Sequence, residues 1–260
     1  MKKVGFIGAG NMGGALISGL LKDKQNYTVF VYDVNEKLVN KYADNGAIPV
    51  SSISDLAKKC EYIVVAVKPN IYDKVLSELA AANYNETVIT IAPGISIEYV
   101  KTKLSNKAKI VRTMPNTPAL ISMGVTLIAK ESGEEADEVA KIFKAVGEVY
   151  YVPEKMMNAG VALSGSSPAY VYSFINALAD GAALQGIPKK SALEIAANTV
   201  IGSALMVLKA GKHPMELLDN VCSPGGTTIE AVNVLKDNNF ESTVIKAMNA
   251  CVEKSNKMSK

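Results

Sequence analysis

The sequence predicts an α/β fold in two parts, a sheet of parallel strands with crossover helices followed by an all-helical part. The first half alternates short apolar runs with amphipathic segments, which is typical of a parallel sheet whose helices connect successive strands. After Pro153 the β-like runs stop, and long alanine-rich segments with few charges follow. The length of 260 residues fits about two domains of roughly 150 residues each. We therefore expect one domain over residues 1–152 and a second over residues 153–260.

Short apolar runs in the first part are the predicted strands. Several are β-branched and almost continuously apolar, as expected where helices cover both faces of a sheet. In chain order they are Val4–Ile7, Thr28–Tyr32, Tyr62–Val67, Thr87–Ile91, Lys109–Arg112, Gly124–Ala129 and Glu148–Val152.

Amphipathic segments between these runs are the predicted helices. In the last of them the apolar residues Val139, Ile142 and Phe143 fall on one face. The segments are Asn11–Lys22, Glu36–Asn45, Ile53–Lys58, Tyr72–Ala81, Ile97–Leu104 and about Glu134–Ala145.

The second part is predicted to be helical throughout. The stretch Tyr170–Leu184 is apolar nearly all round, and such a helix is buried on every side. A subunit interface is the easiest way to bury it in so small a domain, so we expect a homodimer through the helical part. The predicted helices are Pro168–Leu184, Lys189–Ala210, Met215–Asn220, Thr227–Lys236 and Phe240–Lys257.

Composition excludes several classes of protein. One histidine, His213, cannot build the two- or three-imidazole centres of most catalytic zinc and iron sites, and three dispersed cysteines form no CxxC pair, so we predict no metal site. Because the cysteine spacing does not indicate a disulfide scaffold either, we expect a reducing compartment. The net charge of +3 is too small to indicate nucleic acid or an anionic membrane. No uninterrupted apolar run reaches the length of a membrane span, and the first residues do not resemble a signal peptide, so we expect a cytoplasmic protein.

A glycine-rich motif follows the first predicted strand and opens the first predicted helix. In this context GxGxxG indicates a Rossmann-type dinucleotide-binding domain. The first glycine permits a tight turn, the second lets a pyrophosphate approach the backbone, and the third allows the helix to pack closely on the strand. The N–H groups at the helix start then hold the phosphates. The motif residues are Gly8, Ala9, Gly10, Asn11, Met12 and Gly13.

Asp33, at the end of the second predicted strand, is the candidate ribose contact. It lies twenty positions after Gly13, where a carboxylate can hydrogen-bond the 2′-hydroxyl of the adenosine ribose and repel a 2′-phosphate. Alternatively, Asp33 caps the helix that begins near Asn35. Lys37 could neutralise a phosphate, so the cofactor is either NADPH or NADH.

Further candidate cofactor residues follow later strands. Because ligands of open α/β sheets collect at the carboxyl ends of the strands, we assign cofactor contacts to residues at the ends of the third and fourth predicted strands. These are Ala66, Val67, Lys68, Pro69 and Ala92. Alternatively, Lys68 is a solvated loop lysine, which spacing alone favours slightly, and Ala92–Gly94 is a simple turn. The run Met114-Pro115-Asn116-Thr117-Pro118 follows the next strand and either lines the nicotinamide pocket or is a simple turn.

Two segments of the helical part carry a more specific resemblance. The segments Ala162–Tyr170 and Asp219–Val232, with Ser-Pro-Gly-Gly-Thr-Thr inside the second, resemble the signature segments of the pyrroline-5-carboxylate reductase family. The resemblance extends to the amino-terminal glycine motif, to Ala66–Pro69 and to the MPNTP run, and so covers essentially the whole chain. It implies an oxidoreductase of proline biosynthesis that reduces the C=N bond of Δ1-pyrroline-5-carboxylate to L-proline with NAD(P)H.

The resemblance also implies the substrate contacts. Residues 223–228 form a small, glycine-bearing turn at a helix start, so we expect free N–H groups of Gly226 and Thr227 to bind, with Ser223, the substrate carboxylate. By resemblance, Thr228 contacts the ring nitrogen as the catalytic hydroxyl, and Asn220 contacts the cofactor. Without the resemblance, a plain helix-capping turn explains this segment equally well. If the helical part is shared between subunits, the partner chain completes each site.

Some positions depart from the family pattern. Ser167 stands where a second glycine is usual, Ser52 where an asparagine often lies near the adenosine, and Cys222 where threonine is frequent. We interpret Ser167 as a residue able to cap the next helix and Cys222 as a small packed residue. His213, just before a helix, is interpreted as a surface cap rather than a general acid.

Two other functions stay open. The first is an NAD(P)-dependent reductase of similar plan, such as a β-hydroxyacid dehydrogenase, which generally uses a lysine of its helical domain as acid and base. Here the helical lysines lie near helix ends or in charged patches, not in the Ser-Pro-Gly-Gly turn. The second is a non-catalytic NAD(P)-binding redox sensor, which would bind the cofactor without turnover.

Overall fold

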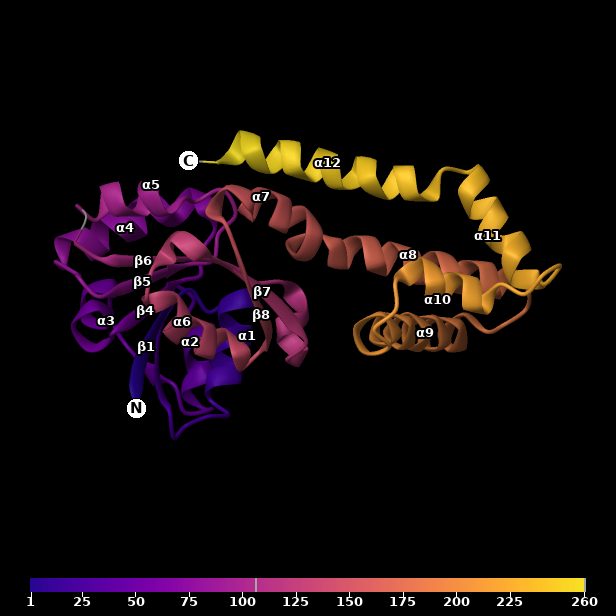
Figure 1. Cartoon of the computed structure of the whole chain (residues 1–260). Helices are drawn as coiled ribbons and strands as arrows, with labels where there is room; N and C mark the ends of the chain where they lie inside the picture. Colours follow the sequence, from indigo (N-terminus) through magenta and orange to yellow (C-terminus); the bar gives the residue numbers. More distant parts are fainter. Residues whose placement is uncertain (106, 260) are drawn as a thin grey trace. The chain divides into compact units, whose positions relative to one another are not determined.

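The computed structural model describes residues 1–105 and 107–259, and these form two compact units (Figure 1). Of the described residues, 1–105, 107–166 and 250–259 belong to the first unit, and 167–249 belong to the second. The units thus divide at residue 166, later than the boundary after residue 152 that we predict from composition.

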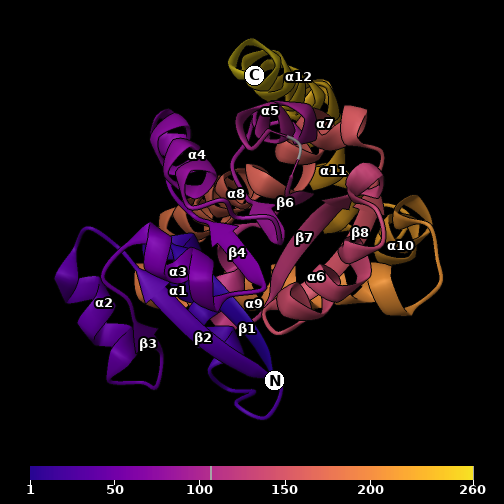
Figure 2. The same cartoon turned by 90° about the vertical axis from the view of Figure 1, so that its left-hand side faces the viewer.

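An eight-stranded sheet forms the centre of the first unit. Its strand order is β3-β2-β1-β4-β5-β6-β7-β8, and Figure 2 shows β2 and β3 at one side of the sheet and β7 and β8 at the other. The strands are β1 (Lys2–Ile7), β2 (Tyr27–Tyr32), β3 (Ile48–Pro49), β4 (Tyr62–Val65), β5 (Thr87–Thr90), β6 (Lys109–Met114), β7 (Gly124–Ala129) and β8 (Gly147–Val152). Every predicted strand is present, whereas the two-residue edge strand β3 was missed because it is too short for a periodic pattern.

The prediction of an entirely parallel sheet is wrong at one pairing. Strands β3 to β6 run parallel, but β7 is antiparallel to β6, and β8 is again parallel to β7. Residues 115–123, which join β6 to β7, contain only the short 3₁₀ helix Thr117–Ile121. A parallel connection needs a crossover of a dozen or more residues, so the chain can only turn back.

Helices cover both faces of this sheet, as predicted. Core residues show that α3, α4, α5 and α7 pack on one face and α1, α2 and α6 on the other. Neighbouring strand residues alternate between the two core clusters, for example Val88 and Ile89 of β5. The helices are α1 (Asn11–Leu20), α2 (Glu36–Ala43), α3 (Ile53–Lys59), α4 (Tyr72–Ala81), α5 (Ile97–Lys103), α6 (Glu135–Lys144) and α7 (Met157–Gly160).

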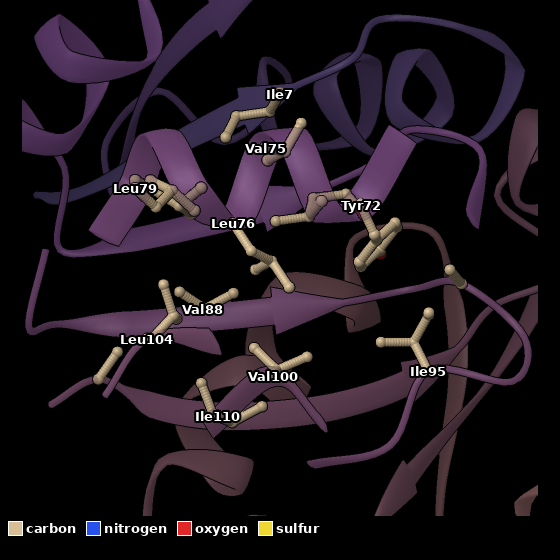
Figure 3. Packing of buried hydrophobic residues seen from close by; sticks show 14 of the residues in the cluster. Ile7, Tyr72, Val75, Leu76, Leu79, Val88, Ile95, Val100, Leu104 and Ile110 are labelled. Atoms are coloured by element: carbon tan, nitrogen blue, oxygen red, sulfur yellow. The ribbon is translucent and has the colours of Figure 1, made fainter. Parts of the chain in front are cut away.

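The core between α4, α5 and the sheet is closely packed (Figure 3). Leu76 of α4 points toward the strand that carries Val88, and both side chains are fully buried. The fully buried Tyr72 donates its hydroxyl to the carbonyl of Val65 at 2.7 Å and lies 3.0 Å from the hydroxyl of Thr90. Burial raises the pKa of Tyr72 to about 12. These contacts fix α4 against the carboxyl ends of β4 and β5, where ligands of such sheets bind.

The second unit is helical and has almost no interior of its own. It contains α8 (Ser167–Leu184), α9 (Lys189–Lys209), α10 (Pro214–Val221), α11 (Thr227–Asp237) and the first part of α12 (Phe240–Met258). Within residues 167–249 the buried side chains are three alanines, Ala179, Ala192 and Ala196. The apolar helix over Tyr170–Leu184, predicted to be buried on every side, therefore exposes most of its apolar residues in the single chain.

Among the described helices, α9 has the length and hydropathy of a membrane-crossing segment. Its mean hydropathy is 1.6, and only 11% of the apolar window is buried within the chain. This is weak evidence for a membrane, because an apolar helix of a soluble protein meets the same criteria.

One connection was not foreseen from the sequence. After β8 the chain forms α7 and a π-helical turn over Val161–Gly165, and the end of α12 returns to the same unit. Asn158 donates to Asn256 at 2.8 Å and to the Ser259 hydroxyl at 3.0 Å, and Asn158 accepts from Ser255 at 3.1 Å. The carboxyl end of the chain is thus part of the sheet-containing unit, although its helix begins in the helical unit.

Candidate functional site

The glycine loop lies at the carboxyl end of β1, between β2 and β4, where the order of the sheet reverses. Gly8 has a φ of +102°, and a Cβ there would lie 2.6 Å from the carbonyl oxygen of Ala66. A Cβ on Gly13 would overlap the carbonyl oxygen of Gly8, whereas nothing lies within 4 Å of a Cβ built on Gly10. As predicted, Gly8 allows the tight turn, Gly10 leaves the backbone open to a ligand, and Gly13 allows close packing of the helix on the strand.

The start of α1 is free of side-chain caps. Its N-cap is Gly10, and no side chain accepts a hydrogen bond from the first turn. The N–H groups of that turn have no intrahelical partners, and the helix dipole makes them attractive to anions. The residues here, which include Asn11 and Met12, fit the pyrophosphate of a dinucleotide.

Asp33 is hydrogen-bonded to the glycine loop. One carboxylate oxygen accepts the N–H of Ala9 at 2.7 Å, and the other accepts the N–H of Asn35 at 2.8 Å. The interpretation of Asp33 as the helix cap is wrong, because the side chain of Asn35 caps α2 by accepting from Lys37. The N–H of Ala9 is thereby engaged by Asp33, and the buried Ala9 contributes to the site by fixing the loop.

Two cavities flank the glycine loop. The first, of about 260 Å³, has a mostly apolar lining that comes from the ends of β1 and β2 and from α4. Its lining residues are Ile7, Gly8, Tyr32, Asp33, Val34, Ile53, Val67, Ile71, Lys74, Val75 and Glu78. The size and lining suit an adenine ring with its ribose beside Asp33.

The second cavity, of about 440 Å³, lies on the other side of the loop and shares Val67 with the first. Its lining residues are Gly10, Asn11, Met12, Ala66, Val67, Lys68, Pro69, Ile91, Ala92, Pro93, Met114, Pro115, Asn116, Thr117, Val161, Gly165 and Ser166. All the predicted residues after β4 and β5 thus lie together at this cavity. Met114, Pro115, Asn116 and Thr117 of the MPNTP run also line it, so a role of this run at the nicotinamide stays a prediction.

Sequence reasoning missed the contribution of the π-helical turn. Val161, Gly165 and Ser166 line the second cavity although no site role was assigned to them. Asn116 holds this turn, because its amide donates to the carbonyl of Ser164 at 3.0 Å while its carbonyl accepts the N–H of Val125 at 2.8 Å. The signal was present in the segment Ala162–Tyr170, which carried the family resemblance without an assigned function.

The turn before α11 differs from expectation at Gly226. Pro224 and Gly225, whose φ is +67°, form a type II turn closed by a hydrogen bond of 3.0 Å from the Gly226 N–H to the Ser223 carbonyl. The Gly226 N–H, predicted to be free for an anion, is therefore already used. A Cβ at Gly226 would overlap the hydroxyl oxygen of Ser223, so glycine is required there for packing.

The rest of that turn leaves polar groups at the helix start. Gly226 is the N-cap of α11, and no side chain caps the helix, so Ser223 and Thr227 are not the capping residues of the alternative interpretation. Thr227 and Thr228 are the first two residues of α11, where N–H groups have no intrahelical acceptor. Ser223 and Thr227 are exposed, and Thr228 is half-buried.

Two further residues lie in the helical unit. Asn220 is on α10 and lines a separate cavity of about 510 Å³ between α9 and α10, so its contact with a cofactor stays a prediction. His213 caps α10: its Nδ1 accepts the N–H of Met215 at 3.2 Å, which confirms its interpretation as a surface cap. Among the described residues no cluster of three or more metal-ligating side chains occurs.

Comparison with known proteins identifies the family. Residues 154–258 match the family model for pyrroline-5-carboxylate reductase dimerisation, and residues 3–94 match the model named NADP oxidoreductase coenzyme F420-dependent. The chain is 44% identical to the pyrroline-5-carboxylate reductase of Escherichia coli, over 100% of this chain and 99% of that protein. The chain belongs to the pyrroline-5-carboxylate reductase family.

Other members of the pyrroline-5-carboxylate reductase family agree in sequence and in structure. The Arabidopsis thaliana enzyme is 36% identical over 99% of this chain and 95% of its own length. The crystal structure of the Plasmodium falciparum pyrroline carboxylate reductase with NADP bound has a TM-score of 0.89 at 33% identity, covering 100% of this chain and 98% of that chain. The structure from Coxiella burnetii has a TM-score of 0.90 at 30% identity, covering 99% of this chain and 98% of that chain. The fold, an N-terminal Rossmann-type domain followed by a helical dimerisation domain, is therefore confirmed.

Proposed function

We propose that this protein reduces Δ1-pyrroline-5-carboxylate to L-proline with NAD(P)H as an oxidoreductase of proline biosynthesis. The 44% identity to a pyrroline-5-carboxylate reductase along the full chain carries the proposal. The two cavities on either side of the glycine loop support it, since they suit the two halves of a dinucleotide.

The two cavities of the cofactor unit would hold the two halves of the dinucleotide. Asp33 and the apolar cavity hold the adenosine, and the first turn of α1 holds the pyrophosphate. Met12 of α1, Lys68 in the loop after β4 and Ala92 in the loop after β5 line the cavity for the nicotinamide. The bound cofactor supplies the hydride. Pro69, Pro93 and Pro115 also line this cavity, and their rigid backbone would help to orient the nicotinamide ring.

The turn Ser223–Thr228 binds the substrate. The Ser223 hydroxyl and the Thr227 N–H hold the carboxylate at the positive end of α11, with the Gly226 N–H committed to closing the turn. The Thr228 hydroxyl hydrogen-bonds the ring nitrogen. The protonated imine is already electrophilic, so the C=N π electrons pass to nitrogen when carbon 5 accepts the hydride. The protein therefore contributes positioning and charge complementarity more than a strong acid.

The protein acts as a homodimer whose interface is the helical unit. Exposed apolar side chains cover α8, α9, α11 and α12 there, and the dimerisation family model spans the same segment. A second copy would cover this surface and provide the burial that α8 lacks within one chain. Such a dimer also accounts for the apolar character of α9 without a membrane. Three unpaired cysteines agree with a reducing, cytoplasmic location.

The decisive experiment follows the loss of NADH and NADPH absorbance with pyrroline-5-carboxylate as substrate. We expect turnover by the purified protein and a fall in kcat of about 100-fold in Thr228→Ala, the scale of losing a positioned hydrogen-bond donor. Thr102→Ala is the matched control and should leave kcat unchanged, because the Thr102 hydroxyl donates to the Tyr99 carbonyl on α5 and Thr102 lines neither cavity of the cofactor unit.

The same assay separates the two alternative functions. A β-hydroxyacid dehydrogenase would leave this imine unreduced but would oxidise its own hydroxyacid with NAD(P)⁺. A redox sensor would bind NADH or NADPH in a calorimeter and turn over neither. Absence of cofactor oxidation with pyrroline-5-carboxylate would therefore contradict the proposal, and cofactor binding would then decide between the alternatives.

A further inference from the structure

We infer that the adenosine cavity selects a cofactor with a free ribose 2′-hydroxyl, so that the protein binds NADH in preference to NADPH. This rests on the proposed function, because it concerns the cofactor of the same site. The inference depends on the fixed carboxylate of Asp33, on the charges around the cavity, and on the position of the only arginine in the chain.

Asp33 is held in place by the backbone. Its two oxygens accept the N–H groups of Ala9 and Asn35, at 2.7 Å and 2.8 Å, so the carboxylate is tied both to the glycine loop and to the start of α2. Each carboxylate oxygen can accept further hydrogen bonds, and a ribose hydroxyl is a suitable donor. A side chain fixed at both oxygens cannot swing away to admit a phosphate without breaking these bonds.

The net charge of the cavity lining also disfavours a phosphate. Asp33 and Glu78 each contribute a carboxylate, and Lys74 is the single cation among the described lining residues. A 2′-phosphate would add close to two negative charges beside the Asp33 carboxylate, where like charges are unfavourable at short range. A neutral hydroxyl at the same position would instead gain a charge-assisted hydrogen bond.

Arginine, the usual partner of a 2′-phosphate, is not available. The chain contains one arginine in 260 residues, Arg112. It lies on β6, is buried with 6% exposure, and pairs with Glu154 at 3.0 Å. Lys37, considered from the sequence as a phosphate partner, lies on α2 and is not among the residues that line the cavity. The chain therefore has no arginine available to bind a 2′-phosphate through two hydrogen bonds.

The test measures binding by isothermal titration calorimetry, independently of turnover. We expect the wild-type protein to bind NADH about tenfold or more tightly than NADPH. The same order should hold for AMP over adenosine 2′,5′-bisphosphate, which differ only in the 2′-phosphate. These fragments report on the adenosine cavity alone, because they lack the nicotinamide.

Variants locate the effect at Asp33. In Asp33→Asn the repulsion is removed, and the ratio of NADPH to NADH dissociation constants should fall about tenfold. Glu36→Gln removes a carboxylate at the start of α2, outside the cavity lining, and should leave the ratio unchanged. Thermal denaturation of each variant checks that the glycine loop remains folded.

Equal or tighter binding of NADPH by the wild-type protein would overturn the inference, whatever the variants do. An unchanged ratio in folded Asp33→Asn would also overturn it. If neither cofactor is oxidised with pyrroline-5-carboxylate but NADH still binds more tightly, the proposed function fails while the inference stands.

Discussion

The cofactor unit and the helical unit of this reductase differ in how they bury apolar surface. In the cofactor unit, two clusters on opposite faces of one sheet contain many side chains with no exposure, such as Phe6, Leu76 and Phe143. In the helical unit, large side chains such as Ile201 and Leu208 are 56% and 75% exposed. The first unit buries its apolar side chains within one chain. The second leaves large apolar side chains exposed, as one half of an interface would. An apolar helix can thus signal an interface between chains rather than an interior.

Breaking the helical interface should have the largest effect. Ile201, Leu205 and Leu208 form a stripe on α9 at helical spacing. Ile201→Glu places a charge in the proposed interface, where an unpaired charge is strongly unfavourable, so we expect dissociation to monomers and loss of reductase activity. Light scattering and NAD(P)H oxidation measure both.

The matched control is the same substitution in the cofactor unit. Ile48→Glu changes an isoleucine on the edge strand β3 that is 42% exposed, and it should leave the dimer and the activity intact. A dimeric and fully active Ile201→Glu protein would show that the helical surface is not the interface.

Removing apolar volume should act differently in the two units. Leu76→Ala creates a cavity in the core of Figure 3 and should lower the free energy of unfolding by about 2–5 kcal/mol. This loss should be the same at every protein concentration. Leu208→Ala, at an exposed position of α9, should instead shift the dissociation constant of the dimer, so its effect on Tm should grow on dilution. If the Tm of both variants changed equally on dilution, the proposed difference between a core within one chain and an interface between chains would be contradicted.

A surface ion pair of the cofactor unit should contribute a smaller, pH-dependent stabilisation. Hydrogen bonds from Lys141 and Lys2 lower the pKa of Glu138 from 4.5 to about 2. Because the folded-state pKa is the lower one, the stabilisation is complete above about pH 4.5 and is lost as the pH falls toward 2. The Tm of Glu138→Gln should therefore lie slightly below that of the wild-type protein at pH 7, and the two values should converge in acid. If the Tm difference between Glu138→Gln and the wild-type protein were unchanged at pH 2, the charge of Glu138 would not be its cause.

The smallest effect is expected at the single histidine. His213 caps α10, and asparagine is an equally good N-cap, so His213→Asn should leave kcat and Tm almost unchanged. Comparing kcat over pH for both proteins is the measurement. A loss of about 100-fold would assign a proton-transfer role to His213, since that is the scale of general acid catalysis.

Much of the fold could be predicted because its signals are local. Runs such as Tyr62–Val65 and Thr87–Thr90 are short and β-branched, and helices such as α4 repeat apolar residues at 3.6-residue spacing, so their type follows from nearest neighbours in sequence. The edge strand β3 has only two residues and no such pattern. The reversal at β7 depends on the length of a connection rather than on the strand's own residues.

The candidate site likewise contains residues that the sequence alone reveals and residues that only folding brings to it. The glycine motif and Asp33 are recognisable because the turn geometry demands particular residues at fixed spacing. Ser166, which follows the π-helical turn, and Glu78 of α4 have no local signal, since they reach the cavities only through tertiary packing. The Gly226 N–H was misjudged because its use depends on a turn hydrogen bond that composition does not reveal.

By itself, the sequence determined the two-part organisation, the dinucleotide loop and the family, because periodicity, glycine positions and specific motifs act over a few residues. Only the tertiary structure decided which donors are engaged and which surfaces lack a partner. It tied Asp33 to two backbone N–H groups, paired Arg112 with Glu154, and left the apolar faces of α8 and α9 uncovered. Hydrogen-bond satisfaction and burial depend on groups far apart in the chain, and these become known only once the chain is folded.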